Sequence, residues 1–288
     1  MNIAPGVEVG DVIFSTNHHS TNLVKHWPLY LPTEQLLCKI DTICRTQGIP
    51  YFIAGATSRE ILIHHVYGRP VGRRTRDVDF AVFVKEWALF DALRQRLCEA
   101  GAQAVKGNAH RMILDGIELD IIPFGGVAEA NKGAWPPDRD AVMAVDGFEE
   151  AFRHTVLVKV APDRPVPFCS LPGLALLKLF AWRDRGTGNS KDAVDLYKII
   201  VKYGVIEEDR IYDWPVEGNA LEWNTLRMGA YLLGSDMAVI TSADSIKKLL
   251  TLDIEKLTDA VVRQSRSESP EEIEKVLEDF WAGIQHSE

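Results

Sequence analysis

The chain has 288 residues, 46% of them hydrophobic, which is enough for one large domain or two ordinary ones with a substantial core. Its 41 acidic residues exceed its 32 basic ones and give a formal net charge of -9. This composition excludes a small disulfide-stapled scaffold and argues against a protein that coats nucleic acid through a basic surface. A polyanionic partner would need a local basic patch or metal ions.

Four scattered cysteines and the first residues of the chain predict a cytoplasmic protein. The cysteines form no CxxC pair, so neither a disulfide framework nor a zinc site is expected. The amino terminus shows no basic segment followed by an apolar run, and no stretch reaches the roughly 18 apolar residues of a membrane span. We therefore expect no membrane partner.

Helix and strand signals alternate up to about residue 165. Apolar residues at helical spacing predict a helix from Thr33, which would cap it, to Gly48. The pattern then predicts these elements in order: a buried strand at 51–54, a turn and helix at 55–66, a strand at 77–84, a helix at 87–101, hairpin strands at 111–114 and 117–124 around Asp115-Gly116, and a strand near 154–160.

After Ser170 the pattern becomes helical. Helices are expected at about 170–184, 190–203, 219–233, 243–262 and 270–284. We therefore predict an α+β fold, in which a mixed sheet flanked by helices is followed by an all-helical part. The boundary is placed at residue 165, which gives a first domain of 1–165 and a helical domain of 166–288.

Three aspartates on predicted strands form the strongest candidate site. Asp77 and Asp79 stand two apart on one strand, so both carboxylates face the same side. Asp120 lies among apolar residues after the hairpin turn, and all three converge if the two strands are neighbours. Mg²⁺ takes such ligands, and three carboxylates would serve a two-metal clamp on a phosphoryl group. The alternative is that these are ordinary strand-end charges.

The turn Gly55-Ala56-Thr57-Ser58-Arg59 is a candidate phosphate site. A strand that ends in glycine and opens a helix exposes backbone amides at the positive helix end. Thr57 and Ser58 would add hydroxyl donors, and Arg59 would add a planar fork. The same residues are also compatible with an ordinary helix start.

Charged residues in the helical half extend the candidate site. Lys178 shares an apolar helix face and either snorkels at its edge or reaches a triphosphate as a point charge. Arg185 and Lys191 add positive charge nearby. Asp192 and Asp195 lie three apart on the next helix, where they either pair with these cations or orient or deprotonate an attacking hydroxyl.

Taken in order, these motifs resemble the DNA polymerase β-like nucleotidyltransferase superfamily and, within it, the AbiEii-type toxin nucleotidyltransferases. The resemblance covers roughly residues 50–200, and its motifs are Gly55-Ala56, Asp77-Val78-Asp79, Asp120 in ELDIIPFGG, Lys178, Arg185 and Lys191-Asp192-Ala193-Val194-Asp195. GATSRE is also similar to the GGxxRD turn of tRNA nucleotidyltransferases. Two departures are Ala56, where a serine hydroxyl is expected, and the insert GRPVGRRTRD, which is either an acceptor site or a solvated loop.

The resemblance implies metal-dependent transfer of a nucleoside monophosphate from an NTP to a hydroxyl acceptor, either a tRNA or other RNA end or a protein. Asp77, Asp79 and Asp120 would then bind Mg²⁺, as one ion or two, with Mn²⁺ as a substitute. The Gly55 turn and Lys178 would cradle the triphosphate. The positions assigned to the NTP site also include Arg185, Lys191 and Asp192. The catalytic residues would be Asp77, Asp79, Asp120, Lys178 and Asp195. A toxin with a cognate antitoxin is implied as well.

Two other functions fit the same motifs. One is a non-catalytic nucleotide-binding or toxin–antitoxin interaction protein, although such a protein would be expected to lose at least one of the three aspartates. The other is a small-molecule nucleotidyltransferase, such as an aminoglycoside-modifying enzyme. Its acceptor cleft should be acidic to receive a cationic drug, whereas the arginine-rich loop at 69–76 would repel one.

Overall fold

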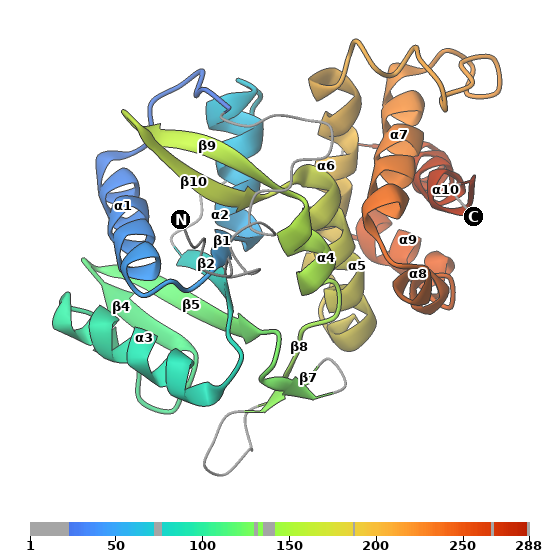
Figure 1. The fold of residues 1–288 in the computed structure, drawn as a ribbon. Coiled ribbons are helices and arrows are strands. Elements are labelled where there is room, and N and C mark those ends of the chain that lie inside the picture. Colours follow the sequence, from blue (N-terminus) through green and yellow to red (C-terminus); the bar gives the residue numbers. More distant parts are fainter. Residues whose placement is uncertain are drawn as a thin grey trace, which may run out of the picture.

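A computed structural model describes residues 23–71, 77–129, 132–134, 142–186, 188–265 and 268–286. Residues 72–76 of the arginine-rich insert lie outside the described part of the chain. A seven-stranded mixed sheet flanked by helices is followed by a bundle of helices, which confirms the expected α+β class (Figure 1). No helix in the described ranges is long and apolar enough to cross a membrane.

The strands of the large sheet lie in the order β3-β4-β5-β2-β1-β10-β9. Their bounds are β1 Tyr51–Ile53, β2 Asp77–Phe83, β3 Gln103–Ala104, β4 Arg111–Leu114, β5 Ile117–Phe124, β9 Thr155–Ala161 and β10 Arg164–Cys169. β2 runs parallel to β5 and β1 runs parallel to β10, whereas the other pairs are antiparallel. Three short strands form a second sheet, namely β6 Ala128–Glu129, β7 Lys132–Ala134 and β8 Val142–Ala144.

The hairpin expected around Asp115-Gly116 is confirmed. β4 and β5 pair with Leu114 opposite Ile117, and the two turn residues have φ values of 54° and 79°. A two-residue turn of this kind needs positive φ at both central positions, which an Asp-Gly sequence adopts readily. The turn therefore fixes the register along the whole hairpin.

The two faces of β2 differ in character. Val78, Phe80 and Val82 are buried in the core. The opposite face carries Asp77 and Asp79 at one end of the strand, and that face ends in aromatic rings where helix α4 (Phe148–Arg153) packs. The rings in contact there are Phe52, Phe83, Phe124, Phe148 and Phe152. This face of β2 therefore carries carboxylates at one end and packs against aromatic rings at the other.

Helices α1 (Leu31–Thr46), α2 (Gly55–Glu60) and α3 (Trp87–Glu99) flank the sheet, and α2 continues into a π-helix, η1 (Ile61–Val66). α1 contacts β9 and β10, whereas α2 contacts β2, β10 and α5. The expected cap at Thr33 is wrong: the N-cap is Tyr30, and no side chain caps this end. A proline in the first turn explains the earlier start, because its fixed φ suits that position.

Strand β10 was not expected, because Pro165 and Pro167 are unfavourable inside a sheet. It nevertheless pairs with β1 on one side and β9 on the other, with an irregular register at Arg164/Pro165. The sheet therefore extends to Cys169, beyond the predicted boundary at residue 165, and helices follow from Leu171. The division into two domains at residue 165 stays a prediction.

Six helices make up the described carboxyl-terminal part: α5 Leu171–Arg185, α6 Lys191–Ile206, α7 Thr225–Ile240, α8 Ala243–Leu249, α9 Ile254–Val262 and α10 Pro270–His286. The single helix expected at 243–262 is wrong. Asp253 interrupts it, because its side chain accepts a hydrogen bond from the Lys256 amide and caps α9. Helix α6 lies between α5 and α7, and Gly204 touches Gly229 where α6 crosses α7.

Candidate active site

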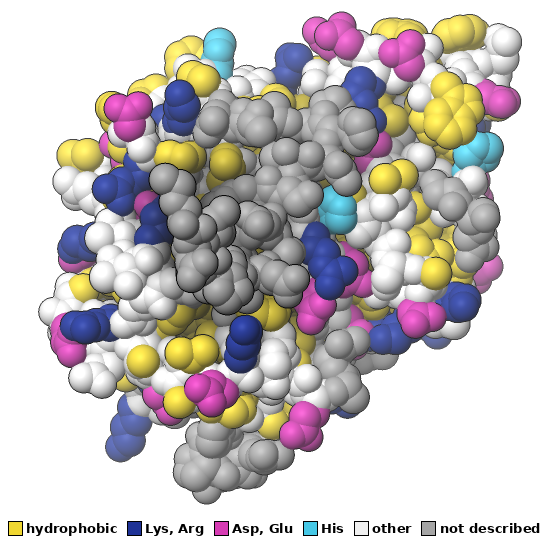
Figure 2. Space-filling view, in the orientation of Figure 1, with side chains coloured by type: hydrophobic (Ala, Val, Ile, Leu, Met, Phe, Trp, Pro, Cys, Tyr) yellow, Lys and Arg dark blue, Asp and Glu magenta, His cyan; other side chains and the backbone are white. Residues whose placement is uncertain are grey.

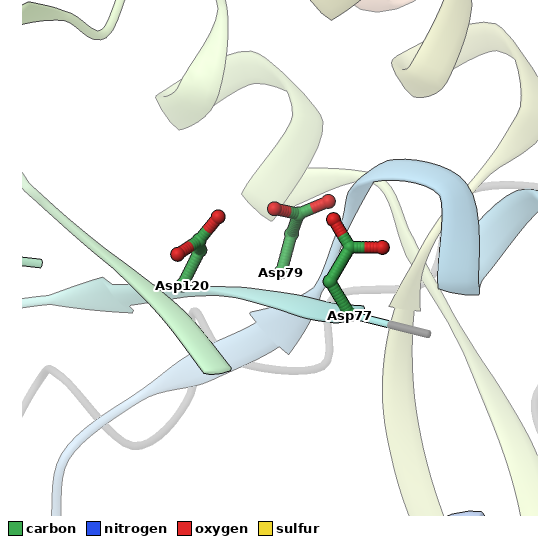
Figure 3. A group of neighbouring side chains, drawn as sticks. All are labelled: Asp77, Asp79 and Asp120. Carbon is green, nitrogen blue, oxygen red and sulfur yellow. The ribbon is translucent and has the colours of Figure 1, made fainter. Parts of the chain in front are cut away.

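The three predicted aspartates gather on one face of the sheet (Figure 3). Asp79 on β2 lies directly opposite Asp120 on β5, and Asp77 precedes Asp79 on the same face. Each offers a carboxylate oxygen within 4.8 Å of those of the other two. The expected convergence of the three carboxylates is confirmed. Among the residues that the structure describes, this is the group of three acidic side chains that could hold a metal ion.

Negative charge is concentrated at this cluster. Burial, followed by the nearby charges of Asp77 and Asp120, raises the pKa of Asp79 to about 6, although Lys178 and Lys191 act in the opposite direction. Carboxylates this close repel one another when ionised. A bound divalent cation would relieve that repulsion, and oxygen donors suit Mg²⁺ or Mn²⁺.

The close approach of the Asp79 carboxylate restricts which residue can occupy position 55. Gly55 has a φ of +59°, and a Cβ at this position would lie 1.8 Å from Oδ2 of Asp79. The backbone of Asp79 also accepts a hydrogen bond of 2.8 Å from the Ala54 amide. Only glycine leaves room for Asp79 here, a role that the sequence pattern alone did not suggest.

The other polar residues of this turn face inward. Thr57 donates to the carbonyl of Asp77 at 2.7 Å, and Ser58 donates to the carbonyl of Cys169 at 2.8 Å. Both side chains are buried. The hydroxyls expected to bind phosphate are therefore engaged by backbone oxygens. They tie α2 to the strand ends instead.

A second acidic pair lies across the site, at the start of α6. Lys178 of α5 reaches Asp192 at 2.9 Å and Asp195 at 3.4 Å, and Arg185 reaches Asp192 at 2.9 Å. Arg59, predicted to bind phosphate, instead donates to Asp195 at 2.6 Å. Of the two alternatives considered for the α6 aspartates, pairing with cations is the one seen in the structure.

The electrostatics of this second pair are the reverse of those of the first. Burial acts to raise the pKa of Asp195, but Lys178 and Arg59 outweigh it and lower the pKa to about 2. The side chains of Asp192 and Asp195 are only 4% and 7% exposed. A carboxylate with so low a pKa stays ionised and is a weak proton acceptor at neutral pH.

A cavity of about 710 Å³ extends from Asp79 and Asp120 of the first cluster to Lys178 and Arg185, the cations that pair with the second. It brings together these predicted site residues: Gly55, Asp79, Asp120, Lys178 and Arg185. Other predicted residues are not part of its described lining: Ala56, Thr57, Ser58, Arg59, Asp77, Lys191, Asp192 and Asp195. Lys191 is exposed at the first position of α6. The remaining wall includes apolar side chains of β8, α4 and α5.

Sequence reasoning missed Arg111, whose guanidinium contacts Asp120 through two nitrogens, at 2.7 and 2.6 Å. A signal for it was present in the hairpin. Once the turn is centred on Asp115-Gly116, antiparallel pairing places residue 111 opposite residue 120. It also missed Lys132, which lines the cavity. Arg183, which the sequence places beside Arg185 in a local cationic patch, lines the cavity as well.

One protein-family model matches most of the chain. The model of a nucleotidyl transferase family, the AbiEii toxin of type IV toxin–antitoxin systems, matches residues 46–279. The chain belongs to the AbiEii family. It is therefore a nucleotidyltransferase, as the order of the motifs led us to expect. The match extends well beyond the stretch on which the resemblance was recognised. No curated protein matches the chain.

Several solved structures show a distant likeness to this AbiEii-family chain. The solution structure of the antibiotic-resistance factor ANT(2'')-Ia shares 16% identity over 77% of this chain and 96% of that one, with a TM-score of 0.38. An antigenic nucleotidyltransferase-like protein from Paracoccidioides brasiliensis shares 17% identity over 58% and 74%, with a TM-score of 0.39. A tRNA-processing enzyme shares 13% identity over 82% and 79%, with a TM-score of 0.22. Likenesses of this size carry no argument about substrate.

Proposed function

We propose that this nucleotidyltransferase uses divalent metal ions to transfer a nucleoside monophosphate from an NTP to a hydroxyl of an RNA end, with release of pyrophosphate. The observation that supports this best is the convergence of Asp77, Asp79 and Asp120 within 4.8 Å, on one side of a cavity that also contains Lys178. Phosphoryl transfer depends mainly on positioning and on neutralising charge, and these groups supply both.

The carboxylate cluster fits a hard cation, because its oxygens are close together, and because burial and the charges of Asp77 and Asp120 raise the pKa of Asp79. Asp77 and Asp79 would hold the metal, with Asp120 as a further ligand of the catalytic ion. When bound, Mg²⁺, or Mn²⁺ in its place, would neutralise charge on the triphosphate and make the attacking hydroxyl more acidic. Two ions would suit three carboxylates better than one.

Lys178 is the main candidate for binding the triphosphate. Lys178 lines the cavity, and its ammonium group forms ion pairs with Asp192 and Asp195, which would fix its position before substrate arrives. Arg185 is 61% exposed and reaches the same cavity, where it would bind a further phosphate oxygen. Asp195 serves this arrangement by holding Lys178 and Arg59, rather than by accepting a proton.

The charge of the cavity favours a polyanionic acceptor. Apart from the metal-binding carboxylates, four basic side chains line it, namely Lys132, Lys178, Arg183 and Arg185, against two acidic ones, Asp146 and Asp184. Once metal ions neutralise Asp79 and Asp120, this balance would favour the phosphates of an RNA end over a cationic aminoglycoside. On the face drawn in Figure 2, the basic and acidic side chains that are coloured are interspersed.

The helices from α5 onward would act as a second domain that completes the NTP site, in line with the division expected at residue 165. The family also suggests a biological context, in which the enzyme acts as a toxin with a cognate antitoxin. NTPs and tRNA are cytoplasmic molecules, and we propose that the enzyme acts there.

A labelling experiment tests the proposal. The purified protein is incubated with each α-³²P-labelled NTP, Mg²⁺ and either total RNA or a protein extract treated with ribonuclease. We expect label on RNA with the unaltered protein and with Lys247→Ala, an exposed control on α8. Label should be absent with Asp79→Asn or Lys178→Met.

Three outcomes would contradict the proposal. Label on protein alone would move the acceptor to a protein hydroxyl. Mg-NTP binding without label on any macromolecule would favour a non-catalytic nucleotide-binding protein. Full activity of Asp79→Asn or Lys178→Met would show that the site is elsewhere.

A further inference from the structure

We propose that Arg111 competes with metal ions for Asp120 and that Glu118 is its second partner, so that the pair Arg111–Glu118 sets the metal affinity of the site. This inference rests on the proposed role of the aspartates as metal ligands. It concerns two residues of the β4–β5 hairpin to which the sequence patterns assigned no role in the site.

The geometry of the pair is specific. Arg111 on β4 lies opposite Asp120 on β5, and its Nε and Nη2 donate to Oδ1 and Oδ2 of Asp120 at 2.7 and 2.6 Å. The third nitrogen, Nη1, donates to Oε2 of Glu118 at 2.7 Å. Glu118 and Asp120 are two apart on one strand and share a face. One guanidinium therefore bridges two carboxylates.

The position of the guanidinium affects the whole cluster. Hydrogen bonding to Asp120 raises the pKa of Arg111, and the charge of Asp77 acts in the same direction. The positive charge of Arg111 thus lies close enough to act on two of the three predicted ligands. A divalent cation at the cluster would be repelled by it, because the group remains charged at every relevant pH.

Asp120 can still bind metal while Arg111 is nearby. Each carboxylate oxygen has two lone pairs, and the guanidinium uses one on each oxygen. A metal ion would take a remaining lone pair, and the repulsion would favour a shift of Arg111 toward Glu118. The side chain of Glu118 is 50% exposed, so an ion pair between Arg111 and Glu118 removes little water from the carboxylate and has a small desolvation free energy. Arg111 would also keep Asp120 correctly oriented, which makes it a positioning residue.

The proposal predicts opposite effects for the two residues. In Arg111→Gln, the repulsion is removed and Mn²⁺ should bind more tightly, by on the order of 10-fold, the size expected when a positive charge a few ångström from a divalent cation is removed in a solvated site. In Glu118→Gln, Arg111 loses its second partner and Mn²⁺ should bind more weakly. A purely structural role of the pair would change both variants in the same direction.

Asp115→Asn is a matched control for Glu118→Gln. Asp115 is an exposed acid on the same hairpin, pairs with Lys39 rather than Arg111, and has a φ of 54° that asparagine also adopts. Asp115→Asn removes one negative charge from the hairpin, as Glu118→Gln does. Its Mn²⁺ affinity should therefore equal that of the unaltered protein.

The measurement is Mn²⁺ binding to the full chain by electron paramagnetic resonance and calorimetry, with thermal melting to confirm folding. Arg111→Lys is the second variant, because it keeps the charge but loses the two-nitrogen contact, and its affinity should stay near that of the unaltered protein.

Unchanged or weaker Mn²⁺ binding in a folded Arg111→Gln protein would overturn this inference alone. Loss of affinity in Asp115→Asn equal to that in Glu118→Gln would also overturn it, since the effect would then be one of overall charge. If the unaltered protein binds no Mn²⁺, or if Asp79→Asn binds it equally well, the proposed metal site fails and this inference fails with it.

Discussion

Two acidic clusters close to the cavity consist of the same residue type in opposite surroundings. The strand cluster, Asp77, Asp79 and Asp120, is crowded with negative charge, and the pKa of Asp79 is raised to about 6. The helix cluster, Asp192 and Asp195, is surrounded by cations, and the pKa of Asp195 is lowered to about 2. One cluster is therefore suited to receive cations, and the other to hold cationic side chains in place.

The largest expected effect comes from the strand cluster. Asp79→Asn should lower NMP transfer by at least about 10³-fold, the scale on which loss of a charge-neutralising group affects phosphoryl transfer. The free energy of unfolding without metal should not fall, because a repulsive charge is removed. Initial rates and urea unfolding test this. A stable, active variant would show that the strand cluster is not the catalytic one.

The helix cluster should respond in the opposite way. Asp195→Asn leaves Arg59, only 11% exposed, without its 2.6 Å partner. Breaking such a pair should lower the free energy of unfolding by about 3–5 kcal/mol. Urea unfolding of this variant beside Asp79→Asn measures the contrast directly. Equal stabilities would mean that the two clusters do not differ in the way described.

Gly55→Ala should damage the strand cluster without removing a charge. The new Cβ would collide with Oδ2 of Asp79, so we expect transfer to fall by about 100-fold, as for displaced reacting groups. Gly48→Ala is the control, because Gly48 has a similar φ of +63° with nothing within 4 Å of a Cβ. It should lose stability through backbone strain alone and retain its activity. Comparable activities in the two variants would contradict the role assigned to Gly55.

The smallest effect concerns pH. The folded-state pKa of Asp195 is about 2, below the ordinary aspartate pKa of 3.8, so its contribution to stability is present above about pH 4 and is lost as the pH falls toward 2. The stability difference between the unaltered protein and Asp195→Asn should therefore narrow by about 1 kcal/mol between pH 6 and pH 3. Urea unfolding at both pH values measures it. A difference that widens at low pH would contradict the pairing.

The sequence predicts the strand cluster well because its signals are local. Strand alternation places Asp77 and Asp79 on one face, and the Asp115-Gly116 turn fixes the hairpin that carries Asp120. The cluster is complete because β2 pairs in parallel with β5. The sequence did not predict this pairing, so the three aspartates were expected to converge only if the two strands were neighbours.

The helix cluster was harder to predict because its partners are distant in the sequence. Residues 59 and 195 meet only when α2 packs beside α5 and α6, and no local pattern reveals that contact. The same reason explains why Thr57 and Ser58 were assigned to phosphate when they bond to backbone carbonyls. Strand β10 was missed because its prolines oppose a strand locally, while β1 and β9 hold it in the sheet.

The contact between Gly55 and Asp79 has a consequence for the evolution of this family. A side chain at position 55 and a carboxylate at position 79 exclude each other by volume. We therefore expect a relative that keeps the acid to keep the glycine, whereas a relative that has lost the acid would be free to vary at both positions. The two sites should therefore change together, so that reading position 55 in a newly sequenced relative would indicate whether its chemistry has been retained.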